Sequence, residues 1–156
     1  MALLVGRHVN KIDKKGRVSV PKPFRDTFAS EGFQGVYAYP SIRFDAIEVC
    51  GETYFRALTQ RLDDQLSMFS PEQDDLLIAI LDNAHALAFD PEGRIVIPAE
   101  LLDMAAITDE ARFVGRVSYF QIWQPDAHEE HRHQGFNQAR ARGVTLPPRQ
   151  PKDGES

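Results

Sequence analysis

The 156-residue sequence contains a single cysteine, Cys50, and no long apolar run. One thiol excludes an internal disulfide and a zinc-ribbon ligand set, so a small buried residue is the expected role of Cys50. The longest strongly apolar run, Leu76–Leu81, is far short of the ~20 residues that a membrane span needs. Met1–Val5 is too short for the apolar part of a secretory leader, about 7–15 residues. These absences predict a cytoplasmic protein with no membrane partner.

The motifs that mark common enzymes are also missing. The sequence has no Gly-x-Ser-x-Gly nucleophile elbow, no phosphate-binding loop and no dinucleotide fingerprint. His8, Asp13 and Ser19 are the residue types of a catalytic triad, but they lie on predicted short strands without such an elbow. We therefore expect no enzymatic activity, no cofactor and no small-molecule substrate.

The strongest positive signal is an internal repeat, seen when the sequence is shifted by 77 residues. The identical pairs in the two copies include His8/His85, Asp13/Asp90, Gly16/Gly93, Arg17/Arg94, Pro21/Pro98 and Asp26/Asp103. Four further pairs keep their apolar character: Ile12/Phe89, Val18/Ile95, Val20/Ile97 and Phe24/Leu101. The match of turn and core residues predicts two copies of one small structural unit.

Each copy contains the signature of a tight turn between two strands. Asp13–Gly16 and Asp90–Gly93 both place Asp at the first position and Gly at the fourth, which suits a type I turn. A left-handed glycine after such a turn closes a β-hairpin, so we expect the flanking strands to pair. Val18 and Val20 alternate at the strand period, as do their counterparts in the second copy.

The rest of the chain is predicted to be short helices, two further hairpins and a polar tail. Short helices are expected at Lys22–Ser30 and Ala99–Ala106, and further hairpins at Val36–Tyr39 with Ala46–Cys50 and at Arg112–Arg116 with Tyr119–Trp123. Longer helices are expected at Glu52–Leu66, after the N-cap Ser70, and at Asp126–Arg140. The predicted segments are a first unit (1–51), connecting helices (52–83), a second unit (84–126), a C-terminal helix (127–141) and a disordered tail (142–156).

Charge is distributed unevenly along the chain. Residues 7–25 carry seven basic side chains against one acid, in a protein whose formal net charge is −5. A basic patch on an acidic body is the electrostatic footprint of a nucleic-acid-binding protein. A charge run of this kind is also compatible with a solvated face that binds nothing.

With both Asp-x-x-Gly-Arg turns and the Phe120-Gln-Ile-Trp123 strand in place, residues 2–135 resemble the MraZ family of the AbrB-like swapped-hairpin superfamily. The resemblance implies an α+β fold, in which two tandem swapped-hairpin units form a β core flanked by helices. It also implies a sequence-specific, nucleoid-associated transcriptional regulator. Members are expected to form homo-oligomeric rings on short G-containing direct repeats of double-stranded DNA. They usually repress the division and cell-wall gene cluster, including their own promoter.

The resemblance also points to DNA-binding residues. The Asp-x-x-x-Arg element of the family falls on Asp13 and Arg17, and again on Asp90 and Arg94. An arginine at a turn tip can pair bidentately with guanine, whereas Asp13 is expected to shape the turn or orient Arg17. The other candidate contacts are cations that neutralise phosphates, namely Arg7, Lys11, Lys14, Lys15 and Lys22.

The second copy departs from the first in charge. Residues 84–102 hold Arg94 against Asp90, Glu92 and Glu100, which gives this stretch a net negative charge. We hypothesise a division of labour in which the first copy makes most DNA contacts. The second copy then chiefly completes the fold and the ring.

Two other functions remain open at this point. His128, His131 and His133 lie close together in sequence and suggest a metal site, although exposed polar helices often look like this. Related swapped-hairpin domains act as antitoxins whose tails wrap a protein toxin. The tail of this chain, ending Lys152–Ser156, lacks the apolar anchors that such a segment needs.

Overall fold

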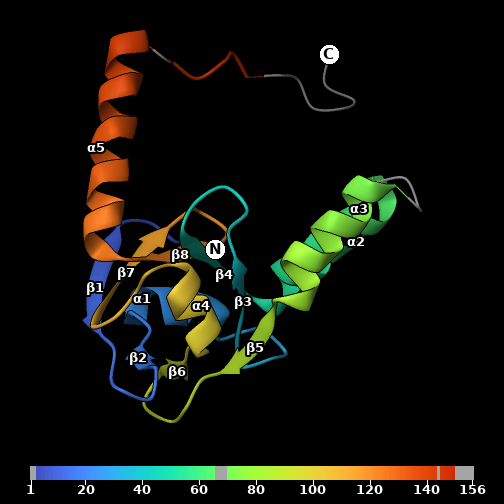
Figure 1. Cartoon of the computed structure of the whole chain (residues 1–156), viewed down its shortest axis with the longest axis vertical. Coiled ribbons are helices and arrows are strands. Elements are labelled where there is room, and N and C mark those ends of the chain that lie inside the picture. The colour runs from blue at the N-terminus through green and yellow to red at the C-terminus, as the bar shows by residue number, and fades with distance from the viewer. Residues whose placement is uncertain (1–2, 66–69, 144, 150–156) are drawn as a thin grey trace. The chain divides into compact units, whose positions relative to one another are not determined.

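The computed structural model describes residues 3–65, 70–143 and 145–149 (Figure 1). The described strands are β1 (Arg7–Lys11), β2 (Arg17–Ser19), β3 (Gly35–Pro40), β4 (Ala46–Cys50), β5 (His85–Ala88), β6 (Arg94–Val96), β7 (Glu110–Gly115) and β8 (Phe120–Trp123). The described α-helices are α1 (Lys22–Arg25), α2 (Glu52–Gln65), α3 (Pro71–Leu77), α4 (Ala99–Met104) and α5 (Pro125–Arg142). The chain divides into two compact units, one ending at Pro125 and the other starting at Asp126.

An antiparallel sheet of six strands, ordered β1-β7-β8-β4-β3-β5, runs through the first unit. The pairs β3–β4 and β7–β8 confirm the two predicted second hairpins. The outer strands are exchanged between copies, because β1 pairs with β7 and β5 pairs with β3. Strands β2 and β6 form a separate two-stranded ribbon in which Val18 lies opposite Ile95.

The prediction that each Asp-x-x-Gly turn joins two paired strands is wrong. The turn at Asp13–Gly16 leads from β1 to β2, and these strands lie in different sheets. Pairing across the copies places Val18 and Ile95, each 1% exposed, in one core cluster with Phe113 of the six-stranded sheet. A unit of about 50 residues that paired only with itself would bury a smaller share of its surface and be only marginally stable. The exchange gives both copies one shared core.

The two copies are related by an approximate two-fold axis. The strand order, read from the other end, interchanges each strand with its repeat counterpart. The hydrogen bond from Val20 N to Gly93 O (3.1 Å) has its counterpart in the bond from Ile97 N to Gly16 O (2.9 Å). The predicted α+β fold, with a β core flanked by helices, is confirmed.

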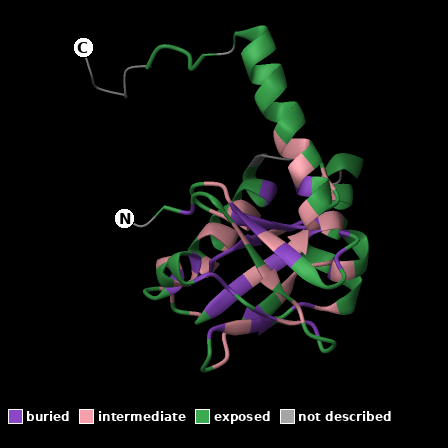
Figure 2. Ribbon diagram, turned by 90° about the vertical axis from the view of Figure 1, so that its left-hand side faces the viewer, coloured by how far each residue is buried: buried purple, intermediate pink, exposed green. Residues whose placement is uncertain are grey.

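The core lies between the six-stranded sheet, the ribbon and the short helices. Phe24 of α1 and Leu101 of α4 occupy matching positions in the repeat and are 1% and 0% exposed. The Phe24 ring packs against Phe120 of β8 at a centroid distance of 5.3 Å. Figure 2 shows buried residues concentrated on the strands of the first unit. Both copies therefore contribute side chains to one hydrophobic cluster.

Helices α2 and α3 form an arm between the two copies. The Ser70 side chain caps α3 by accepting a hydrogen bond from Gln73 N (3.1 Å), which confirms the predicted N-cap. Phe55 of α2 stacks on Tyr37 of β3 at 4.7 Å, so the apolar face of α2 packs against β3 of the sheet. Leu66, predicted to lie on the same face, is outside the described residues.

The second unit contains most of the predicted polar helix, which the structure confirms as α5. From His133 to Arg142 every residue of α5 is exposed. Residues 145–149 are exposed and lack regular secondary structure, whereas 144 and 150–156 of the predicted tail lie outside the described residues. Within the described ranges, no helix has the length and apolar character of a membrane span.

Candidate nucleic-acid interface

The two Asp-x-x-Gly turns have the predicted backbone geometry. Gly16 N donates to Asp13 O (3.0 Å), and Gly93 N donates to Asp90 O (2.9 Å). Both glycines have a left-handed conformation, with φ of +84° and +78°, which a residue with a Cβ rarely adopts. A Cβ on Gly16 would also lie 2.6 Å from Ile97 O. Glycine is therefore required by both the turn and the ribbon that follows it.

The aspartate of each turn is occupied by local hydrogen bonds. Lys15 N and Arg17 N both donate to Oδ1 of Asp13 at 2.9 Å, and Arg17 Nε donates to Oδ2 at 2.6 Å. The bond from the Arg17 backbone is the main reason why the pKa of Asp13 is lowered. Asp13 thus shapes the turn and orients the arginine, as the sequence suggested.

The second turn repeats these contacts. Glu92 N and Arg94 N donate to Oδ1 of Asp90 at 2.9 Å, and Arg94 Nε donates to Oδ2 at 2.7 Å. The pKa of Asp90 is lowered for the same reason as that of Asp13, since the Arg94 backbone donates to it. The local structure around the two carboxylates is therefore the same in both copies.

The two arginines differ in what surrounds their terminal nitrogens. Asp13 engages Nε of Arg17, and within the described part of the chain no hydrogen bond reaches its Nη1 or Nη2. Arg94 has an additional carboxylate nearby, because Oε2 of Glu92 lies 3.6 Å from its Nη1. The Arg17 side chain is 39% exposed and the Arg94 side chain 31%. Arg17 is thus the more available of the two for an external ligand.

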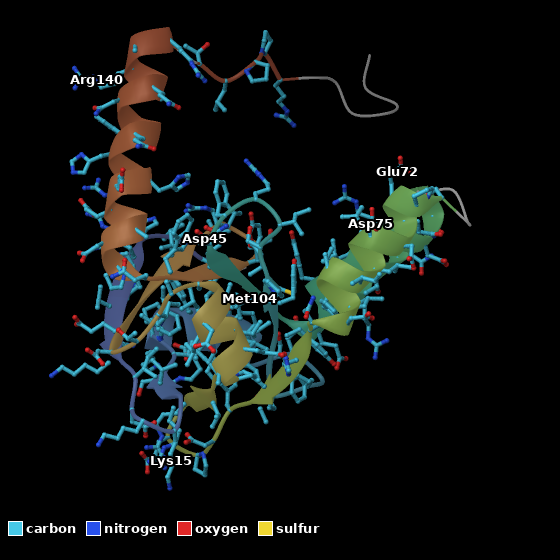
Figure 3. All side chains as sticks on the ribbon, viewed as in Figure 1. Lys15, Asp45, Glu72, Asp75, Met104 and Arg140 are labelled. Carbon is cyan, nitrogen blue, oxygen red and sulfur yellow. The ribbon has the colours of Figure 1, made fainter. Side chains whose placement is uncertain are left out.

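The predicted phosphate-binding cations are not all in one place. Lys14 and Lys15 are exposed on the same turn as Arg17, and Lys11 is exposed at the end of β1. Figure 3 shows Lys15 at the outer end of this turn. Arg7 begins β1, and the four steps of extended strand from Arg7 to Lys11 span about 13 Å. Lys22 is exposed but forms an ion pair with Asp26 at 2.9 Å.

The structure adds one cation to which the sequence gave no role. Arg25, at the end of α1, reaches the second turn, where its Nη1 donates to Glu92 O at 3.3 Å. The two residues are 67 positions apart in sequence, so no local pattern predicts the contact. The only available signal was that Arg25 belongs to the basic stretch 7–25.

The first unit carries basic residues near the turn at Lys15 and acidic residues on the helical arm of α2 and α3. The acidic residues of the first turn of α3 are Glu72 and Asp74. Figure 3 shows Glu72 and Asp75 of α3 on the far side of the first unit from Lys15. A polyanion approaching this unit is therefore attracted to the turn and repelled by the helical arm.

The alternative chemistries gain no support from the described residues. The recurring histidines pack or hydrogen-bond, with His8 edge-on to the Phe24 ring and His85 Nε2 2.5 Å from Glu100 Oε1. Among described residues, no group of three or more His, Cys, Asp or Glu could hold a metal ion. Burial raises the pKa of the Cys50 thiol to about 12, which leaves it protonated near neutral pH.

Comparisons with known proteins all identify the same family. Residues 80–145 match a family described as "MraZ protein, putative antitoxin-like". The chain is 40% identical over 146 residues to the "Transcriptional regulator MraZ" of Rickettsia felis, an alignment that covers 94% of this chain and 97% of that protein. It is 41% identical over 137 residues to the protein of the same name from Rickettsia bellii, with 88% and 91% covered. Both alignments extend well beyond the segment that the family description matches.

Proposed function

The chain belongs to the MraZ family of DNA-binding transcriptional regulators, and we propose that it represses its own promoter and the division and cell-wall gene cluster. In this proposal it binds short G-containing direct repeats as a homo-oligomeric ring. The family is one of regulators, so the chain is not an enzyme. The observation that carries the proposal is the Arg17 guanidinium, which Asp13 holds at an exposed turn with its terminal nitrogens unengaged in the described part of the chain.

Arg17 is the proposed base-reading residue. Two parallel N–H groups of a guanidinium match O6 and N7 of guanine in the major groove. Asp13 bonds Nε and not the terminal nitrogens, so Arg17 keeps both of its terminal groups for such a pair. A fixed side chain loses less conformational entropy on binding, which favours recognition. A contact of this kind is worth ~1–3 kcal/mol of discrimination against the wrong base.

The lysines are proposed to hold the DNA backbone. Lys14 and Lys15 share the turn with Arg17, and Lys11 lies just before it. Each phosphate that a lysine neutralises releases counterions, which increases the magnitude of the slope of log K against log salt by about 0.9. Arg7 and Lys22 are proposed as weaker contributors, because Arg7 lies at the far end of β1 and Lys22 is paired with Asp26.

The second turn is proposed to contribute less to base recognition. Glu92 stands where the first copy has Lys15, and its carboxylate lies near Arg94. A carboxylate at the tip repels phosphate and competes with guanine for the arginine. Asp90 and Arg94 therefore chiefly stabilise the turn.

A ring gives these weak single contacts a useful affinity. One turn spans only a few base pairs, so one protomer binds weakly. Linking several turns in an oligomer makes later contacts intramolecular and raises affinity through effective concentration, provided that the DNA repeats match the spacing of the turns. Repeated DNA boxes and an oligomeric protein are therefore expected together.

The proposal is tested by fluorescence anisotropy with a G-containing direct repeat and a scrambled duplex, across a salt series. We expect wild type to prefer the repeat and Arg17→Ala to lose that preference while keeping a steep salt dependence. Arg43→Ala is the matched control, since Arg43 is an exposed arginine of the β3–β4 loop. Absence of any preference in wild type would refute sequence-specific recognition.

Repression and assembly need separate measurements. A reporter fused to the promoter of the chain's own gene should rise in activity when the gene is deleted and fall when it is restored. Light scattering after size exclusion should give a mass that is a multiple of 17.6 kDa. A reporter that falls on deletion would identify an activator, and a monomeric mass would exclude the ring.

A further inference from the structure

Arg25 breaks the symmetry between the two turns. Its counterpart in the second copy is Leu102, a partly buried residue that packs against the hydrophobic core. Arg25 instead extends from α1 of the first copy to the turn of the second. No corresponding cation reaches from the second copy to the first turn, since position 102 is leucine.

The Arg25 guanidinium is placed directly against the second turn. Nη1 donates to Glu92 O at 3.3 Å, and a Cβ on Gly93 would overlap the guanidinium. The absence of a side chain at Gly93 is therefore what allows Arg25 to lie there. This contact fixes one nitrogen of the guanidinium on the backbone of the turn.

The remaining donors of Arg25 are available to a ligand. The residue is only partly buried, and within the described residues no hydrogen bond reaches its Nε or Nη2. Arg94 bonds Asp90 of the same turn through its Nε, so two arginine side chains contact this turn. The positive charge of Arg25 adds to that of Arg94 and offsets the carboxylates of Asp90 and Glu92. The surface at the second turn is therefore less negatively charged than residues 90–94 alone indicate.

We propose that Arg25 forms a phosphate-binding site at the second turn, through which that turn contacts the DNA backbone. A guanidinium with free donors and one nitrogen fixed matches the geometry of a phosphate group. The second turn then positions DNA without reading its sequence, while the first turn reads bases. The inference rests on the proposed location of the DNA interface.

The alternative role for Arg25 is purely structural, as a clamp that joins α1 to the second turn. Two substitutions separate the roles. Arg25→Gln removes the charge and keeps a polar side chain, whereas Arg25→Lys keeps the charge. Arg43→Gln serves as the matched control, because it removes an exposed positive charge elsewhere.

The experiment measures binding of full-length variants to the repeat and to a scrambled duplex across a salt series. For Arg25→Gln we expect roughly 3- to 10-fold weaker binding to both duplexes near 0.1 M salt, and a salt slope smaller by about 0.9 per protomer bound. The ratio of the two affinities should stay constant. Arg25→Lys should retain the wild-type slope.

An unchanged slope for Arg25→Gln would overturn the proposal and leave the clamp as the role of Arg25. A selective loss on the repeat would also overturn it, because that result identifies a base contact. Thermal unfolding of each variant identifies any loss of fold; if Arg25→Gln unfolds, Arg25→Leu, which copies the leucine at position 102 of the second copy, replaces it as the uncharged variant whose slope is measured. Loss of preference in Arg17→Ala alongside an unchanged Arg25→Gln slope would refute this site and leave the proposed function standing.

Discussion

The turns at Asp13–Arg17 and Asp90–Arg94 share their backbone and differ in their charge. Each has a left-handed glycine and an aspartate that accepts two backbone N–H groups and one arginine Nε–H. The residues between differ, since the first turn carries Lys14 and Lys15 where the second carries Pro91 and Glu92. The shared residues are those that the turn requires, and the variable ones are those that face solvent. A fold built from two copies can therefore keep its symmetry while its surfaces diverge.

The largest expected effect tests whether the buried cores of the two copies contribute equally to stability. Phe24→Ala and Leu101→Ala truncate matching, fully buried side chains. Both should destabilise the protein strongly, by ~3–5 and ~2–5 kcal/mol respectively, because each leaves a cavity in the shared core. Urea unfolding gives the free energies. A small loss of unfolding free energy in Leu101→Ala, beside a large loss in Phe24→Ala, would show that the core of the second copy contributes less to stability.

The next effect concerns the two arginines. Arg17→Glu should abolish preference for the repeat, a loss of ~1–3 kcal/mol in base discrimination. Arg94→Glu should change that preference much less, because Glu92 already lies beside this guanidinium. Competition binding with matched and scrambled duplexes measures both. Equal losses would contradict the division of labour.

A smaller effect should follow from exchanging the charges at the third position of each turn. Lys15→Glu should weaken binding to both duplexes and lower the salt slope, since it removes a phosphate contact. Glu92→Lys should do the opposite and raise the slope by about 0.9 if the new cation meets a phosphate. Binding isotherms at several salt concentrations give the slopes. A Glu92→Lys variant with wild-type affinity would place the second turn away from DNA.

The smallest expected effect is a change in the pH dependence of stability, and it should be the same for both turns. The pKa values of Asp13 and Asp90 are lowered from 3.8 by bonds to the ionised carboxylate. A lowered pKa means that the stabilisation is present above the unfolded value and is lost as pH falls through the folded one. Urea midpoints at about pH 6 and about pH 3 should therefore differ less in Asp13→Asn and Asp90→Asn than in wild type. A difference between the two variants would show that the turns are not electrostatically alike.

Local features of the fold were predictable from sequence, and its strand exchange was not. Turn chemistry identified Asp13 and Gly16, and helical capping identified Ser70, because these signals depend on neighbours in the chain. The alternation of Val18 and Val20 indicates a half-buried strand without naming its partner. Pairing within a copy and pairing between copies satisfy the same pattern. The choice depends on how much apolar surface each buries, which no local window contains.

The candidate site was predictable to the same extent, because its local contacts follow from the sequence and its tertiary contacts do not. Arg17 was identified from the repeat, and its contact with Asp13 lies within one turn. Arg25 was grouped with the cations of the first copy, although its side chain lies against Gly93 of the second. The position follows from the tertiary fold, which brings α1 beside a turn that lies 67 residues further along the chain. A charge run in a sequence therefore identifies the cations, but the tertiary fold is needed to say which surface each of them lies on.

The exchange of β1 and β5 also has a consequence for synthesis of the chain. Strand β1 pairs with β7, whose residues follow it by roughly 100 positions, so the nascent first copy lacks its sheet partner. At about 5–20 residues per second, β1 waits on the order of 5–20 s before β7 is made. During that interval an unpaired strand edge is open to a neighbouring nascent chain on the same messenger RNA. Translation speed through residues 52–115 thus competes with pairing between chains.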